Sequence, residues 1–348
     1  MTLTKDQELV VNFYNNIGNA FKGSLLDIQE GPKVNNFIYK PDDNFNMNKA
    51  TKLAQLVSGR VRPDYNNQTV VFEVPKEVGQ TISLNKLLQS KEFQTSKATL
   101  PVVLGTDTLG NIMISDLQKF PHLLIGGRTG SGKTNLLKSM LKSLSEKLKP
   151  SECQFIIIDP KSVEFAGINK WEKEKHLYMP IINDTYEAIN ILKSMVQTME
   201  ERYQILKQHK VKTIKEYKEK THKNDMPYII VAIDELADLM VIAKKDVESN
   251  IQYLLQKARA TGIHLVIATQ RCSSDVITNI IKANCPTRVS FQTQTGKDSN
   301  AILDEKGAEQ LLPFGDMLFS DAGCMPVRMH TAYISDEELV TITDKLRG

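Results

Sequence analysis

Residues 122–134 read HLLIGGRTGSGKT, an apolar run that leads through a glycine-rich turn into a helical pattern. From Gly127 to Thr134 the stretch fits the pattern G-x-x-x-x-G-K-[ST]. Glycines let the backbone curl so that successive N–H groups point at phosphate oxygens, and the following helix adds the positive end of its dipole. The stretch therefore predicts a phosphate-binding loop between a strand and a helix.

The chemistry of this loop gives two of its side chains a role. Lys133 is expected to reach the β and γ phosphates of ATP, and the Thr134 hydroxyl is expected to bind Mg²⁺. The alternative is a glycine turn that binds no ligand, which leaves the flanking strand and helix patterns unexplained. The residues predicted to hold the nucleotide are Gly127, Arg128, Thr129, Gly130, Ser131, Gly132, Lys133, Thr134 and Asn135.

A second motif, about a hundred residues downstream, supplies acidic groups. Residues 228–235 read YIIVAIDE, an apolar strand pattern that ends in two acids. Asp234 is predicted to hold the metal, directly or through water, and Glu235 to orient and deprotonate the attacking water. The alternative for this pair is an acidic helix N-cap after a buried strand.

A polar side chain follows a further apolar run at residues 264–269. Gln270 stands directly after this run, where it could sense the γ-phosphate and act with the catalytic groups. The alternative is a polar residue that ends a strand and faces solvent.

Outward from these motifs, apolar strand patterns alternate with long amphipathic helix patterns from residue 121 onward. This alternation predicts an α/β fold with a mostly parallel sheet flanked by helices. The predicted strands are residues 122–125, 155–159, 228–234 and 264–269, and the predicted helices are residues 133–148, 186–206 and 249–260.

The first hundred residues are less regular and predict a small α+β domain over residues 1–100, with the α/β domain over residues 101–348. A length of 348 residues suffices for two domains. In the small domain, helices are predicted at residues 9–21 and 48–57, and strands at residues 69–74 and 80–84. The segment GPKVNNFIYK, residues 31–40, predicts a turn that leads into another strand.

Composition restricts the classes of protein. No run of 18 apolar residues exists, and the N-terminus lacks the apolar core of a secretory signal, so a cytoplasmic protein is expected. The four cysteines show no zinc-ligand spacing and predict reduced thiols, mostly in the core. A net charge of +3 means that any contact with nucleic acid depends on local positive charge.

The motifs together resemble one family. FPHLLIGGRTGSGKT, IIIDPKSVEF, IIVAIDELADLM, QKARATGIHLVIATQR and ILDEKGAEQLLPFGDML occur in the order typical of FtsK/SpoIIIE DNA translocases, and the resemblance runs from about Gly31 to Glu338. It implies a RecA-like P-loop ATPase domain beside a smaller domain. It also implies a homo-oligomeric ring, expected to be hexameric, that hydrolyses ATP and pumps double-stranded DNA.

In such a ring, each ATP site lies between subunits and a neighbour's arginine completes it. Arg259, in the segment QKARA, matches the family's position for this arginine, and Arg288 is the second choice. The alternative role for Arg259 is a salt bridge on the protein surface.

The resemblance also implies DNA contacts. Arg271 matches a basic pore residue, and the segment from Gln294 to Asn300 matches the second pore loop. Where the family usually has a lysine and an arginine four residues apart, this chain has its lysine one place later, at Lys297, and Asn300 in place of the arginine. Each lost phosphate contact weakens DNA binding and its salt dependence, although asparagine can still donate a hydrogen bond to a phosphate.

Chromosomal members of the family carry membrane helices and a winged-helix domain, and neither is recognisable in these 348 residues. A motor that serves DNA transfer, segregation or a mobile element is therefore expected. The sequence does not identify a membrane-anchored or recombinase partner. The alternative function is a nucleotide-switched adaptor that recruits DNA for conjugation or packaging without sustained translocation. A small-molecule kinase has only the phosphate loop in its favour.

Overall fold

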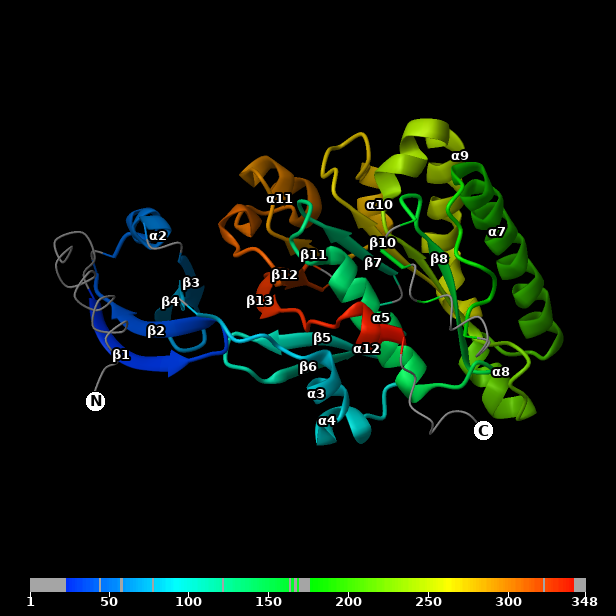
Figure 1. Cartoon of the computed structure of the whole chain (residues 1–348), viewed down its shortest axis with the longest axis horizontal. Coiled ribbons are helices and arrows are strands. Elements are labelled where there is room, and N and C mark those ends of the chain that lie inside the picture. The colour runs from blue at the N-terminus through cyan, green and yellow to red at the C-terminus, as the bar shows by residue number, and fades with distance from the viewer. Residues whose placement is uncertain are drawn as a thin grey trace.

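Two β-sheets organise the chain in the computed structural model, a small one near the N-terminus and a large one flanked by helices (Figure 1). The predicted helix at residues 9–21 lies outside the described residues. Among the described helices, none combines the length and apolar character needed to cross a bilayer. The structure describes residues 23–43, 45–56, 59–76, 78–120, 122–162, 164–165, 168, 176–321 and 323–340.

The large sheet has nine strands in the order β6-β5-β13-β12-β11-β7-β10-β9-β8. Its strands are β5 (Pro101–Asp107), β6 (Ile112–Asp116), β7 (His122–Gly126), β8 (Cys153–Ile158), β9 (Tyr228–Ile233), β10 (Ile263–Thr269), β11 (Thr287–Phe291), β12 (Asp316–Ser320) and β13 (Val327–His330). The run from β11 to β8 is parallel, and the remaining pairs are antiparallel. The α/β class predicted from the sequence is confirmed, but the sheet is mixed because its other half is antiparallel.

Consecutive side chains of the parallel strands point to opposite faces, and each face is covered by helices. Leu123 and Ile125 of β7 pack toward α5 (Lys133–Lys147), whereas Leu124 packs on the other face with α7 (Thr185–Gln208) and α9 (Leu236–Lys257). Helices therefore cover both sides, as the unbroken apolar strand patterns predicted. These helices are α5 (Lys133–Lys147), α7 (Thr185–Gln208) and α9 (Leu236–Lys257), with α8 (Ile214–Thr221), α10 (Asn279–Asn284), α11 (Gly296–Leu303) and α12 (Asp336–Val340).

The small sheet has four antiparallel strands in the order β1-β2-β4-β3, with helix α2 packed on it (Figure 1). Aromatic and β-branched side chains such as Phe37, Phe72 and Val74 form its core. The predicted strand at residues 69–74 and the predicted helix at residues 48–57 are confirmed within one residue. The elements are β1 (Gly23–Glu30), β2 (Val34–Pro41), α2 (Met47–Leu56), β3 (Arg60–Asp64) and β4 (Thr69–Pro75).

The strand predicted at residues 80–84 is wrong. Only Ser83 makes an isolated bridge, to Tyr333, and the chain then turns into α3 (Leu84–Leu88) and α4 (Lys91–Gln94). Leu84, Leu87 and Leu88 have helical spacing and bury one face of α3 in the core of the large sheet. Because α3 and α4 pack there, a boundary near residue 80 is favoured over the predicted one at residue 100, and both remain proposals.

A buried ionic network joins the two sheets. The Arg328 guanidinium on β13 is about 1% exposed and donates to Asp316 at 3.0 and 2.6 Å, and to Glu73 of β4 at 3.1 Å. Although burial alone raises the pKa of Asp316, the Arg328 and His330 side chains hold that pKa well below its ordinary value. Glu73 also accepts from Arg62 at 3.0 Å. The small sheet is therefore tied to the antiparallel half of the large one by charges with little access to water.

Replacing Arg328 by alanine is expected to destabilise the protein by about 3–5 kcal/mol, because two buried carboxylates would lose their main cation. Denaturant unfolding followed by circular dichroism measures this. Lys215, exposed in an ion pair with Glu219, is a control whose replacement by alanine should cost at most about 0.5 kcal/mol. Equal losses of unfolding free energy in the Arg328 and Lys215 variants would show that the network does not hold the sheets together.

Candidate nucleotide site

The glycine-rich loop follows β7 and is braced against a second loop. Gly132 has a φ of 120°, and a Cβ there would come within 2.9 Å of the Gly315 Cα atom. The Gly315 N–H donates to the Ser131 carbonyl at 2.8 Å. Only glycine suits position 132, because an L side chain would meet both the strained φ and the neighbouring backbone.

Lys133 opens α5 and is almost fully buried. Its Nζ atom donates to the carbonyls of Gly127 and Arg128, each at 2.7 Å. Burial lowers the pKa of Lys133 to about 8, against the opposing effect of the Glu235 carboxylate. The ammonium group thus lies inside the curl of the loop, where phosphate oxygens would be surrounded by N–H donors.

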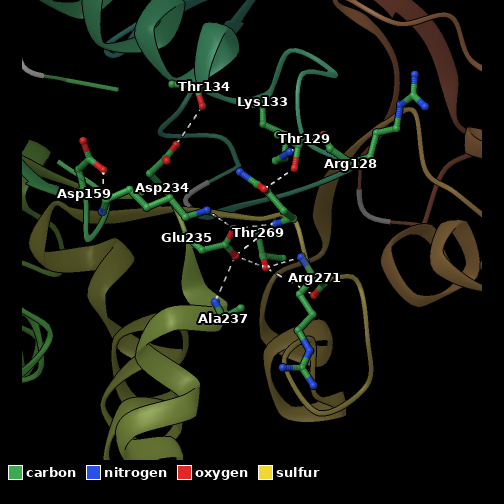
Figure 2. A network of polar contacts seen from close by, with 12 residues as sticks. Arg128, Thr129, Lys133, Thr134, Asp159, Asp234, Glu235, Ala237, Thr269 and Arg271 are labelled. Atoms are coloured by element: carbon green, nitrogen blue, oxygen red, sulfur yellow. Dashed lines mark hydrogen bonds and ion pairs between the residues drawn. The ribbon is translucent and has the colours of Figure 1, made fainter. Parts of the chain in front are cut away.

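Thr134 and Asp234 meet across the sheet edge. The Thr134 hydroxyl donates to the Asp234 carboxylate at 3.1 Å, although the two residues belong to separate motifs (Figure 2). Burial first, and then the neighbouring Asp159 carboxylate, raise the pKa of Asp234 to about 6. A hydroxyl and a carboxylate side by side are hard oxygen ligands of the kind that Mg²⁺ prefers, so the pair fits that ion.

Glu235 begins α9 and its carboxylate accepts several hydrogen bonds. Thr269 Oγ1 donates at 2.6 Å and the Gln270 N–H at 3.1 Å, both from the end of β10 (Figure 2). The Ala237 N–H donates at 3.3 Å, so Glu235 is also the N-cap of α9. Lys161 Nζ lies 3.6 Å away. The acid is thus held at a fixed place beside the loop, and the cap and the predicted catalytic role are compatible.

Gln270 links the end of β10 to the phosphate loop. Its Oε1 atom accepts a hydrogen bond from the Thr129 hydroxyl at 2.6 Å. Thr129 and Gln270 line both a cavity of about 650 Å³ on one side and a smaller cavity of about 320 Å³ on the other. The hydrogen-bonded pair is therefore part of the wall between the two cavities.

The larger cavity has the volume of a nucleotide-sized ligand site. Of the predicted nucleotide residues, Thr129, Gly130, Gly132, Lys133, Thr134 and Asn135 line it. Gly127, Arg128 and Ser131 do not, and the Ser131 hydroxyl instead donates to the Arg128 carbonyl at 2.7 Å.

Sequence reasoning missed the opposite wall of this cavity. Lys33 and Lys76 of the small-sheet region and Phe314 and Tyr333 of the antiparallel half all line it. Lys33 Nζ donates to the Phe314 carbonyl at 2.8 Å, which joins the two parts of the wall. No sequence pattern gives these positions a role in the nucleotide site, because they meet only after the small sheet packs against the large one.

The two candidate arginines lie in different surroundings. Arg259 is exposed in the short helix η2 (Ala258–Thr261) before β10, and among the described residues its side chain has no ion-pair or hydrogen-bond partner. Strands β7 and β10 are parallel, so Arg259 lies at the sheet edge opposite its own phosphate loop. Arg288 instead donates to the carbonyls of Cys285, Ile302 and Lys282 and pairs with Asp304. Arg259 is thus the one available to a neighbouring molecule.

The predicted DNA-contact residues lie near the same sheet edge as the phosphate loop. Arg271 follows β10 and is exposed, with Asp275 at 2.9 Å. Lys297 and Asn300 are exposed on α11, which follows β11. Because β10 and β11 flank β7 as parallel neighbours, their carboxyl ends place these residues at one edge of the sheet.

Comparisons with known proteins agree with this architecture. The model of the FtsK/SpoIIIE family matches residues 83–274. The DNA translocase SftA of Bacillus subtilis is 41% identical over 340 residues, covering 94% of this chain and 35% of that protein. The DNA translocase FtsK of Campylobacter jejuni is 42% identical over 337 residues, covering 93% and 35%. The chain thus spans about a third of the length of these relatives.

Among solved structures, the pCW3 conjugation coupling protein TcpA in its monomer form with ATPγS is similar. It superposes with a TM-score of 0.67 and 23% identity, over 94% of both chains. This likeness shows that the two chains share the same α/β fold.

Proposed function

Because this chain belongs to the FtsK/SpoIIIE family, we propose that it hydrolyses ATP and uses the energy to move double-stranded DNA. The observation that carries this proposal is the meeting of Thr134 and Asp234 at 3.1 Å on the edge of a nucleotide-sized cavity. The predicted phosphate loop and the predicted second acidic motif thereby form one site.

In this site each residue has a distinct task. Lys133 and the N–H groups of the loop bind the β and γ phosphates. Thr134 and Asp234 would hold Mg²⁺, which would neutralise charge on the phosphate oxygens. Glu235 accepts the proton of the attacking water, and Thr269 and the Gln270 N–H fix its orientation through the hydrogen bonds described above. Gln270 lines the same cavity, which supports a contact with the γ-phosphate.

Assembly into a ring completes the site. Arg259 lies at the sheet edge opposite its own loop, so it can serve a site only on another subunit. A guanidinium added in this way stabilises charge in the transition state of phosphoryl transfer. A head-to-tail arrangement of subunits forms a closed ring when the rotation between neighbours closes, and we propose a hexamer around the duplex.

Contacts to DNA come from the edge of the sheet that carries the phosphate loop. Arg271, Lys297 and Asn300 are exposed there and could bind backbone phosphates without reading sequence. ATP cleavage can then move Arg271, because Arg271 directly follows Gln270, which borders the nucleotide cavity.

Duplex DNA carrying a short triplex-forming strand tests the proposal. The purified chain is expected to hydrolyse ATP faster when long duplex DNA is added, and to displace the third strand only with hydrolysable ATP. A non-hydrolysable ATP analogue is the control and should leave the triplex intact. Binding of ATP and DNA without any displacement would overturn the motor function and leave a nucleotide-switched adaptor.

A further inference from the structure

Arg128 lies within the phosphate loop, yet its side chain leaves the nucleotide site. Figure 2 shows it extending away from Asp234 and from Thr134, on the far side of the loop. The side chain is exposed and lines the smaller cavity of about 320 Å³, not the nucleotide-sized one. The backbone explains this direction, because the Arg128 N–H donates to the Gln292 carbonyl at 2.8 Å, next to the loop that leads into α11.

The smaller cavity is polar and has two arginines on its wall. Arg128 comes from the phosphate loop and Arg271 from the segment after β10, and side chains with hydroxyl and amide groups also line the cavity. Its lining residues are Arg128, Thr129, Gln270, Arg271, Cys272, Ser273, Thr293, Gln294 and Asp298. Such a set of cations and neutral hydrogen-bond donors suits a phosphate group.

The acids near this cavity are engaged elsewhere or are exposed. Among the described residues, the Arg128 guanidinium has no ion-pair or hydrogen-bond partner. Asp298 is held by Thr295, whose N–H and hydroxyl donate to it at 3.0 and 2.8 Å in a capping box. Arg271 pairs only with Asp275, and both side chains are about half exposed, so solvent screens that pair. Positive charge in this cavity is thus available to an external anion.

We propose that Arg128 binds a backbone phosphate of duplex DNA at this cavity, in addition to the separate contact proposed above for Arg271, whose side chain extends in a different direction (Figure 2). The proposal rests on the function proposed above and adds a contact from the phosphate loop itself. The two arginines each adjoin one member of the hydrogen-bonded pair Thr129–Gln270, which borders the nucleotide cavity. A shift of this pair on ATP cleavage would therefore move both DNA contacts at once.

Equilibrium binding of duplex DNA in a non-hydrolysable ATP analogue, measured over a range of salt concentrations, tests the inference. Arg128→Gln removes the charge and keeps a shorter, polar side chain. It is expected to weaken duplex binding at least about tenfold through loss of a charge-assisted hydrogen bond. The slope of log affinity against log salt should also fall by about 1 for each contacting subunit. Arg128→Lys should retain most of the salt slope.

Two controls make the result specific. Lys193→Ala removes an exposed cation from the outer helix α7 and should leave DNA binding unchanged. Binding of a fluorescent ATP analogue to Arg128→Gln should stay within about twofold of the unaltered chain, because Arg128 does not line the nucleotide cavity.

The outcomes separate the inference from the proposed function. An unchanged salt slope for Arg128→Gln, in a chain that binds duplex DNA, overturns the inference alone. Weaker ATP binding with normal DNA binding would assign Arg128 to the nucleotide instead. An unaltered chain that binds no duplex at all would remove both proposals.

Discussion

Replacing Lys133 by alanine should weaken nucleotide binding at least about 100-fold and leave no measurable ATP hydrolysis. The ammonium group is buried inside the curl of the loop, where it lies 2.7 Å from two carbonyls. A phosphate in that curl would receive hydrogen bonds from a full charge, each worth about 1.5–3 kcal/mol. Titration with a fluorescent ATP analogue measures binding, and phosphate release measures hydrolysis.

Mixing inactive subunits distinguishes a shared site from an unfolded variant. Neither Lys133→Ala nor Arg259→Ala should hydrolyse ATP alone. In an equal mixture, an interface is complete when the Arg259 variant supplies the loop and the Lys133 variant supplies the arginine. With random assembly, each of these two conditions holds at half of the interfaces. About one interface in four should therefore recover activity. No recovery in assembled rings would show that Arg259 does not act between subunits.

The parallel half of the large sheet could be predicted because its strands are buried on both faces. Each strand reads as an unbroken apolar run such as residues 228–233, and the helices between them repeat every three to four residues. The antiparallel half could not, since Asp316 and Arg328 interrupt the apolar patterns of β12 and β13. These charges are buried only because they pair with each other and with Glu73 from the other sheet.

In the small sheet, the strength of the local pattern decided what could be predicted. Residues 69–75 are almost entirely buried and read as a strand. Strand β3 reads RVRPD, is half-buried throughout and contains Pro63, so neither alternation nor composition marks it. In the segment after β4, the apolar residues fit the spacing of a strand as well as that of a helix. Packing against the core of the large sheet favours the helix, α3.

For the candidate site, the motifs predicted those residues that lie within them. They did not predict the residues that come to the cavity from other parts of the fold. Thr134 was predicted to bind Mg²⁺ as the hydroxyl residue of the phosphate-loop motif, and Asp234 as the acid after the second apolar strand; the two side chains are hydrogen-bonded in the structure. Lys33 and Tyr333 line the same cavity without any local signal. The motif also could not predict the direction of the Arg128 side chain, because that direction depends on the hydrogen bond from the Arg128 N–H to the Gln292 carbonyl.

Replacing Glu235 by glutamine should stop ATP hydrolysis while ATP binding persists. Glutamine keeps the volume of the side chain and an oxygen that can accept from the Thr269 hydroxyl, now at 2.6 Å, so the end of β10 should keep its place. It cannot accept a proton from water, and loss of a general base lowers rates by about 10²–10⁴-fold. On the same sample, phosphate release should therefore be lost while binding of the ATP analogue persists.

Asp238→Asn is the matched control for this change. Asp238 lies in the first turn of α9, near Glu235, so its replacement removes one negative charge from the same helix end. The lost interaction with the helix dipole costs about 0.3–1 kcal/mol of stability. Among the described residues Asp238 makes no hydrogen bond or ion pair with the phosphate loop, so hydrolysis should change by only a few-fold. If Glu235→Gln hydrolysed ATP as fast as Asp238→Asn, the hydrogen bonds around Glu235 would have only the structural task of capping α9 and anchoring β10. The proton of the attacking water would then have to go to another acid at this edge, and Asp159, which lies beside Asp234, would be the first to test.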